Sequence, residues 1–202
     1  MWGLVESGSI TKLITKPKGL VIGDVRHSRK IFELWSKSEL EAIGIYEVEF
    51  DNTNKKDDQW YINTNQSFAF ADGKITASYG SATAKAHADT LFTAQDETDG
   101  KGTEGEVKTR GLKYNLIQTI KKQAAGILQD TDWYIVRKAD AGTAVPSSIT
   151  NHRAAVRTKA AEMETAITNA ADTPALETLY TYTEQEDDSV TRPLGELPRL
   201  ES

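Results

Sequence analysis

The chain has 202 residues, of which 38% are hydrophobic, and its formal net charge is −6 at neutral pH. This length allows one domain or two small ones, and the low hydrophobic content favours an elongated or multi-part molecule. The negative charge argues against nucleic acid as the main partner, because phosphate binding needs clustered Lys and Arg, and the absence of cysteine excludes disulfides, thiolate catalysis and cysteine zinc sites.

Membrane insertion and secretion are not expected either. The sequence contains no apolar run of the roughly 18 residues that a membrane-spanning helix needs. The residues after Met1 lack the layout of a signal peptide. We therefore expect a protein that is made and used in the cytosol.

Residues 1–58 are predicted to form a small β-rich module. Ser7-Gly8 separates two apolar runs, at 2–6 and 9–14, and is typical of a hairpin turn. Further on, Ser36 and Glu39 form a capping-box pattern that opens a short helix over 38–43, which Gly44 can end. The alternation of apolar and polar residues over 45–50 then predicts a half-buried strand.

A β-hairpin followed by a helix is predicted over residues 59–96. Asp72-Gly73 lies between apolar runs at 68–71 and 75–79, which is a strong hairpin signal. Ser81 or Thr83 can cap an alanine-rich helix over 82–95. The next residues, 97–106, contain several glycines and no large apolar side chain, so we expect a linker there.

Residues 107–172 are predicted to form a helical hairpin, in which residues 133–136 are extended. Packing of its two helices within one chain is favoured over an oligomeric coiled coil, although a homo-oligomer stays open. After it, residues 173–202 are expected to form an extended acidic tail with a strand over 179–183. Together these elements predict an α+β fold. The face of the second helix is formed by Ile149, Arg153, Val156, Ala160, Met163, Ile167 and Ala170.

Catalytic and metal-binding patterns are missing from the sequence. His27, His87 and His152 lie far apart, and none has a ligand partner at metal-site spacing. No nucleophile stands beside a candidate base, and no Gly-Lys-Ser/Thr motif follows the glycines near the N-terminus. We therefore expect no enzyme, no catalytic residue, no metal and no cofactor, with His152 as a packed ring.

Two groups of aromatic residues are expected either to pack in a core or to bind a partner. Trp133 and Tyr134 are expected to be buried and to pin the two C-terminal helices together, with direct contact to a partner as the alternative. If Trp133 is buried, Trp133→Ala should cost about 3–5 kcal/mol. The second group belongs either to a core or to a binding surface, and it comprises Trp60, Tyr61, Phe68, Phe70 and Tyr79.

A resemblance to known proteins rests on residues 128–157. Leu128, Thr131-Asp132-Trp133, Pro146 and the run His152-Arg153-Ala154-Ala155-Val156-Arg157 resemble a signature of bacteriophage tail assembly chaperones and tail-fibre assembly proteins. There the signature reads as a Leu, a Thr-Asp-Trp, a Pro and a Tyr-Arg-x-x-Leu-Arg run, so that His152 replaces the usual Tyr and Val156 the usual Leu. The run over residues 31–51 is similar to N-terminal modules of phage tail-fibre-associated proteins.

The resemblance implies a non-enzymatic phage tail protein whose partners are tail-fibre or baseplate proteins. It would lie in the tail of the virion, and in the host cytoplasm during assembly. A permanent subunit and a transient chaperone both stay open. The alternative function is a distal host-recognition module that binds surface polysaccharide by stacking sugars on the aromatic group from Trp60 to Tyr79.

Overall fold

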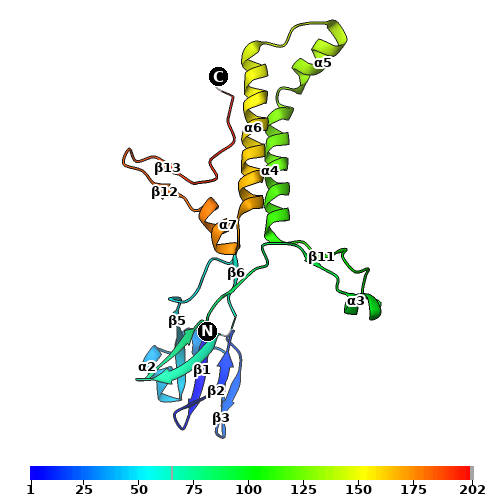
Figure 1. The fold of residues 1–202 in the computed structure, drawn as a ribbon. Helices are drawn as coiled ribbons and strands as arrows, with labels where there is room; N and C mark the ends of the chain where they lie inside the picture. The colour runs from blue at the N-terminus through cyan, green and yellow to red at the C-terminus, as the bar shows by residue number, and fades with distance from the viewer. Residues whose placement is uncertain (65, 201–202) are drawn as a thin grey trace. The chain divides into compact units, whose positions relative to one another are not determined.

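The computed structural model describes residues 1–64 and 66–200 (Figure 1). The chain forms two compact units, residues 1–83 and 84–202. Strands dominate the first unit and helices the second, which confirms the predicted α+β class. The boundary lies at Thr83 and Ala84, not within the linker expected at 97–106.

A five-stranded sheet organises the first unit. Its strand order is β2-β1-β5-β8-β7, and only the β5–β8 pair is parallel. The two edge strands, β2 and β7, also contact each other, so the sheet curves round on itself. The strands are β1 (Trp2–Glu6), β2 (Ser9–Ile14), β5 (Ile45–Asp51), β7 (Ser67–Ala71) and β8 (Lys74–Ser78).

Both predicted hairpins of this sheet are confirmed. Ser7-Gly8 joins β1 to β2, and Asp72-Gly73 joins β7 to β8. All four turn residues have positive φ, between 51° and 77°. This geometry belongs to the two-residue turn whose twist matches that of paired strands, and Gly adopts it without strain.

The alternation of side chains along the strands builds two apolar clusters, one on each face of the sheet. On β5, Ile45 enters the first cluster and Val48 the second. Buried members of the first cluster are Leu4, Ile14, Leu20, Ile31, Leu40 and Ile45, and those of the second are Val48, Ile75 and Ala77.

A short hairpin and two short helices cover the first cluster. The hairpin, β3 (Leu20–Ile22) and β4 (Val25–His27), was not predicted. Helix α1 spans Ile31–Leu34 and α2 spans Lys37–Ala42. The predicted capping box is confirmed: the Glu39 N–H donates to Ser36 Oγ, and the Ser36 N–H donates to the Glu39 carboxylate at 2.7 Å. Gly44, with a φ of 81°, follows the helix as expected.

The helix predicted over residues 82–95 is wrong. The chain instead forms β9 (Thr83–Ala84), which pairs with β6 (Tyr61–Ile62), and β10 (Thr90–Leu91). Asp89 explains the departure, since its carboxylate accepts the Gly111 N–H at 2.7 Å and Arg110 at 2.6 Å. These distant contacts outweigh the weak helical preference of the alanines.

The expected linker at 97–106 is an ordered part of the second unit. Thr93 and Asp96 form a capping box that opens α3 (Ala94–Thr98). Asp96 is buried and pairs with Lys108 at 2.8 Å, and β10 pairs with β11 (Val107–Thr109) across the segment. The glycines of residues 97–106 therefore lie in the turns between α3 and β11 and do not form a flexible linker.

Two long helices, α4 (Leu112–Gln129) and α6 (Ser147–Asn169), pack against each other as a hairpin (Figure 1). Every member of the predicted face of the second helix, from Ile149 to Ala170, is buried. The prediction that residues 133–136 are extended is wrong, because they belong to α5 (Asp132–Ala141). A left-handed Gly142, with a φ of 68°, ends α5.

The tail is folded over part of its length, which corrects the extended form expected for 173–202. Helix α7 (Thr173–Tyr180) begins where the Asp172 carboxylate accepts the Ala175 N–H at 2.8 Å. This helix takes in residues 179 and 180 of the strand predicted at 179–183, of which only Thr183 lies in a strand. A short hairpin, β12 (Thr183–Glu184) and β13 (Val190–Thr191), follows, and Leu194 is fully buried after it.

Candidate functional site

The corner between α4 and α5 brings together four of the residues that carry the resemblance, Leu128, Thr131, Asp132 and Arg153. Helix α4 ends at Gln129, and α5 begins at Asp132, with two residues between them. Thr131 lies in the corner, 2% exposed, and its hydroxyl donates to the Leu128 carbonyl at 3.0 Å. This bond satisfies one of the carbonyls that a helix end leaves without a partner.

Arg153 of α6 clamps this corner. One terminal nitrogen of its guanidinium donates to the Leu128 carbonyl at 2.7 Å and to Thr131 Oγ1 at 2.6 Å. The other lies 2.8 Å from the Asp132 carboxylate. The planar fork of arginine thus bonds the end of one helix, the residue between the helices and the start of the next.

The bonds of Arg153 to Leu128 and Thr131 stabilise the corner more than its ion pair with Asp132, because these partners differ in exposure. The Arg153 side chain is 9% exposed, whereas the Asp132 side chain is 56% exposed. A charged donor to a buried carbonyl contributes more than a neutral hydrogen bond, while an exposed carboxylate remains well solvated. The bonds to Leu128 and Thr131 therefore dominate the stabilisation.

The other signature residues on α6 divide between core and surface. Val156 and His152 are buried, and both lie on the face that packs in the helical hairpin. Arg157 is exposed and reaches only the Arg153 carbonyl, at 3.5 Å. Pro146 stands directly before α6 and is exposed.

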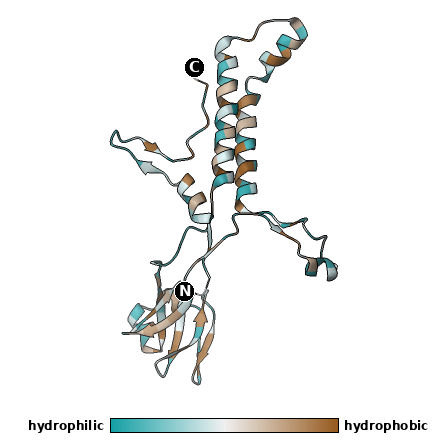
Figure 2. Cartoon of the chain, in the orientation of Figure 1, coloured by the Kyte–Doolittle hydropathy of each residue, from teal (hydrophilic) through white to brown (hydrophobic). Residues whose placement is uncertain are grey.

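Trp133 is not buried, contrary to the expectation. It is 51% exposed, and Ile135 and Val136 beside it are also exposed. The Trp133 and Tyr134 rings lie 4.1 Å apart between centroids, and the Arg137 guanidinium stacks 4.5 Å from the Trp133 centroid. Helix α5 contains no buried residue, although part of it is strongly hydrophobic (Figure 2).

The aromatic group from Trp60 to Tyr79 does not form one exposed surface. Trp60 and Tyr61 are buried. Phe68 and Phe70 are half-buried against the second apolar cluster, where Phe70 lies 4.7 Å from the Tyr46 ring. Tyr79 is half-buried under the Lys55 ammonium. Trp60 and Tyr61 therefore belong to the core and not to an exposed glycan-binding surface.

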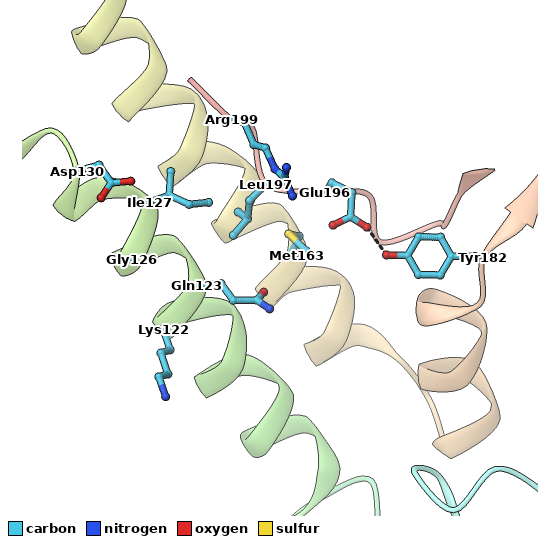
Figure 3. A pocket seen from close by; sticks show the side chains of 10 residues that line it. All are labelled: Lys122, Gln123, Gly126, Ile127, Asp130, Met163, Tyr182, Glu196, Leu197 and Arg199. Carbon is cyan, nitrogen blue, oxygen red and sulfur yellow. Dashed lines mark hydrogen bonds between the residues drawn. The ribbon is translucent and has the colours of Figure 1, made fainter. Parts of the chain in front are cut away.

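A groove of about 770 Å³ lies in the second unit between α4, α6 and the C-terminal segment (Figure 3). Met163 and Ile127 face it from the helices, and Leu197 faces it from the C-terminal segment. On its rim Tyr182 donates to the Glu196 carboxylate at 2.6 Å. The lining includes both signs of charge, with Lys122, Gln123, Gly126, Asp130 and Arg199 completing it.

The perturbed carboxylates serve local structure. Hydrogen bonds from Lys108 and from the Thr93 N–H lower the pKa of Asp96 to about 2. Hydrogen bonds from the Gly111 N–H and Arg110 likewise lower the pKa of Asp89. The Asp96 carboxylate caps α3, and the Asp89 carboxylate accepts the N–H of Gly111 directly before α4. Over residues 1–64 and 66–200, no three His, Asp or Glu side chains gather as a metal site requires.

The described part of the chain contains no helix that is long and apolar enough to cross a membrane. Comparison with protein-family models, with curated proteins and with solved structures finds no match.

Sequence reasoning named the residues of the clamp but not their geometry. Leu128, Thr131, Asp132 and Arg153 were singled out by the resemblance, and they meet in one site. Arg153 was placed on the apolar face of the second helix, but its partners were not predicted, although this spacing places a cation on a buried face. Such a cation needs oxygen partners, and the end of the preceding helix supplies them.

Proposed function

We propose that this chain is a non-enzymatic bacteriophage tail protein that takes part in tail-fibre or baseplate assembly. The observation that carries the proposal is the exposed apolar side chains of α5, a helix held at the end of the helical hairpin by the Arg153 clamp. The clamp is built from the residues that resemble the signature of tail assembly chaperones and tail-fibre assembly proteins.

Helix α5 supplies the contact surface in this proposal. Its apolar side chains Trp133, Ile135 and Val136 are 43–65% exposed, and no residue of the helix is fully buried. Clustered exposed apolar residues mark contact sites, and tryptophan is among the residues that contribute most to binding. The clamp fixes the start of the helix, so that little conformational freedom is lost on binding. The partner is a tail-fibre or baseplate protein, and a homo-oligomer of the chain stays a prediction.

Quantitative mass spectrometry of gradient-purified virions tests the proposal. A fixed ratio to the major capsid protein, in multiples of three or six, is expected for a permanent subunit on a trimeric fibre or sixfold baseplate. Absence from virions together with co-purification with a fibre protein from infected cells is expected for an assembly chaperone. Absence from virions without any bound tail protein would overturn the proposal.

Variants of α5 locate the contact. Val136→Ser should weaken co-purification with the tail partner, because Val136 is exposed on the proposed surface. Val21→Ser is the matched control, since Val21 is equally exposed but lies on β3 of the first unit. Equal loss in both variants would remove α5 from the interface.

The alternative of polysaccharide binding through Trp60 and Tyr61 is not favoured. Sugar stacking needs accessible ring faces, and both rings are buried.

A further inference from the structure

A second aromatic site lies in the first unit, in a groove of about 230 Å³ between the sheet and the turn that joins α1 to α2. Its floor is apolar, formed by Leu40 and Ile45 of the first cluster. Three aromatic side chains line it, Trp2 from β1, Phe32 from α1 and Trp35 directly after α1.

The rings of this groove are held by packing. Trp2 and Phe32 lie 4.8 Å apart between centroids and are half-buried. Trp35 is 36% exposed, and the His27 ring packs nearly perpendicular to it at a centroid distance of 5.7 Å. A ring that is fixed on one side and open on the other presents a flat apolar face without a large loss of side-chain freedom on binding.

Polar groups of opposite charge stand beside the rings. Glu47 lies directly across from Trp2 in the pairing of β1 with β5, so both side chains project from the same face of the sheet. The Glu47 side chain makes no hydrogen bond or ion pair within the described chain, and it is exposed. Lys37, the first residue of α2, supplies ammonium donors and makes only a 3.8 Å contact with Glu41.

This combination selects the chemistry of a ligand. The aromatic walls suit an apolar face, the Glu47 carboxylate accepts hydrogen bonds, and the Lys37 ammonium donates them. Because the two charges have opposite sign, neither an anion nor a quaternary ammonium ion is favoured. The small volume suits a single ring. We propose that this groove binds one neutral pyranose unit of a saccharide, with a C–H face of the sugar on Trp35 and its hydroxyls on Glu47 and Lys37.

The inference does not rest on the proposed tail function, because the site lies in the other unit and uses other residues. It moves the glycan-binding surface from the buried Trp60 and Tyr61 to Trp2, Phe32 and Trp35. The run over residues 31–51 supplies most of the groove, and Trp2 completes it from the opposite side of a sheet pairing.

Saturation-transfer difference NMR on the full chain tests the site with three probes, the methyl β-glycosides of glucose, galactose and N-acetylglucosamine. At least one is expected to bind, with the strongest transfer to the ring C–H protons. Trp35→Ala should weaken that binding by roughly tenfold, the effect of losing about 1.4 kcal/mol. Trp35→Phe, which keeps a flat ring, should restore most of it, and Glu47→Gln should weaken binding less than Trp35→Ala.

Phe50→Ala is the matched control. Phe50 is an aromatic residue on β5 that is more exposed than Trp35 but does not line the groove, and its loss should leave binding unchanged. Binding of none of the three glycosides would overturn the inference, as would affinity that Trp35→Ala leaves unaltered. Tighter binding of tetramethylammonium than of any glycoside, lost in Trp35→Ala, would make the groove a cation site and equally overturn it. Unchanged circular dichroism of each variant establishes that it is folded.

Discussion

Removal of the Arg153 guanidinium should destabilise the helical hairpin. In Arg153→Met the side chain keeps most of its apolar stem but loses its bonds to the Leu128 carbonyl and Thr131 Oγ1, and its ion pair with Asp132. Thr131 still donates to the Leu128 carbonyl, so the corner is not left entirely unsatisfied. The exposed Asp132 carboxylate is also solvated by water after the change.

The magnitude follows from these contacts. Hydrogen bonds from a charged donor contribute about 1.5–3 kcal/mol each, and the remaining Thr131 bond and the better burial of methionine offset part of the loss. We expect Arg153→Met to lower the free energy of unfolding of the second unit by about 2–3 kcal/mol. Asp132→Asn should cost less than about 1 kcal/mol, because that partner is largely exposed.

Urea unfolding followed by the helical circular dichroism signal measures the effect, since the long helices belong to the second unit. Arg157→Ala is the control: Arg157 occupies the same helix, is exposed and makes one long contact, so its change should cost less than about 0.5 kcal/mol. If Arg153→Met is as stable as Arg157→Ala, the clamp does not organise this corner and the reasoning is refuted.

Three further predictions follow from individual side chains. Trp133→Ala should cost less than about 1 kcal/mol in urea unfolding, because the ring is half exposed, and a loss of 3 kcal/mol would show that it is buried. Hydrogen bonds from Lys108 and from the Thr93 N–H lower the pKa of Asp96 from 3.8 to about 2, so this carboxylate stabilises the fold above pH 4. That contribution should fade as the pH drops from 4 to 2, and Asp96→Asn should flatten the acid side of the stability profile, whereas an identical profile would contradict the pairing. Gly126→Ala should stabilise α4 by about 0.5–1 kcal/mol because its added methyl group enters open space, whereas Gly44→Ala should destabilise, since Gly44 has a φ of 81° and the new Cβ would lie 2.7 Å from a carbonyl oxygen. Equal midpoints for these two glycine variants in a thermal melt would contradict both assignments.

Local chemistry explains why several elements could be predicted. The turns at Ser7-Gly8 and Asp72-Gly73 need positive φ at adjacent residues, and few residue pairs provide it. The capping box at Ser36 and Glu39 depends on atoms three residues apart. The buried face of α6 follows from helical periodicity alone. In each case the partners lie close together in the chain.

Other predictions were wrong because the deciding contacts lie far apart in the chain. Residues 82–95 have the composition of a helix, but Asp89 bonds to Arg110 and Gly111, more than twenty residues away. Trp133 was expected in the core because large rings are usually buried, yet α5 packs against too little of the chain to cover it. Composition does not report which neighbour a side chain will meet.

By itself, the sequence determined the α+β class, both hairpins of the main sheet, the helical pair and the residues of the clamp. Only the tertiary structure decided that Arg153 bonds the Leu128 carbonyl, that Trp60 is buried while Trp133 is exposed, and that Trp2 and Trp35 share a groove. Turns and helical faces depend on dihedral preferences and short spacings, which are properties of neighbouring residues. Exposure and site geometry depend on contacts between segments far apart in the chain, and these exist only once the chain has folded.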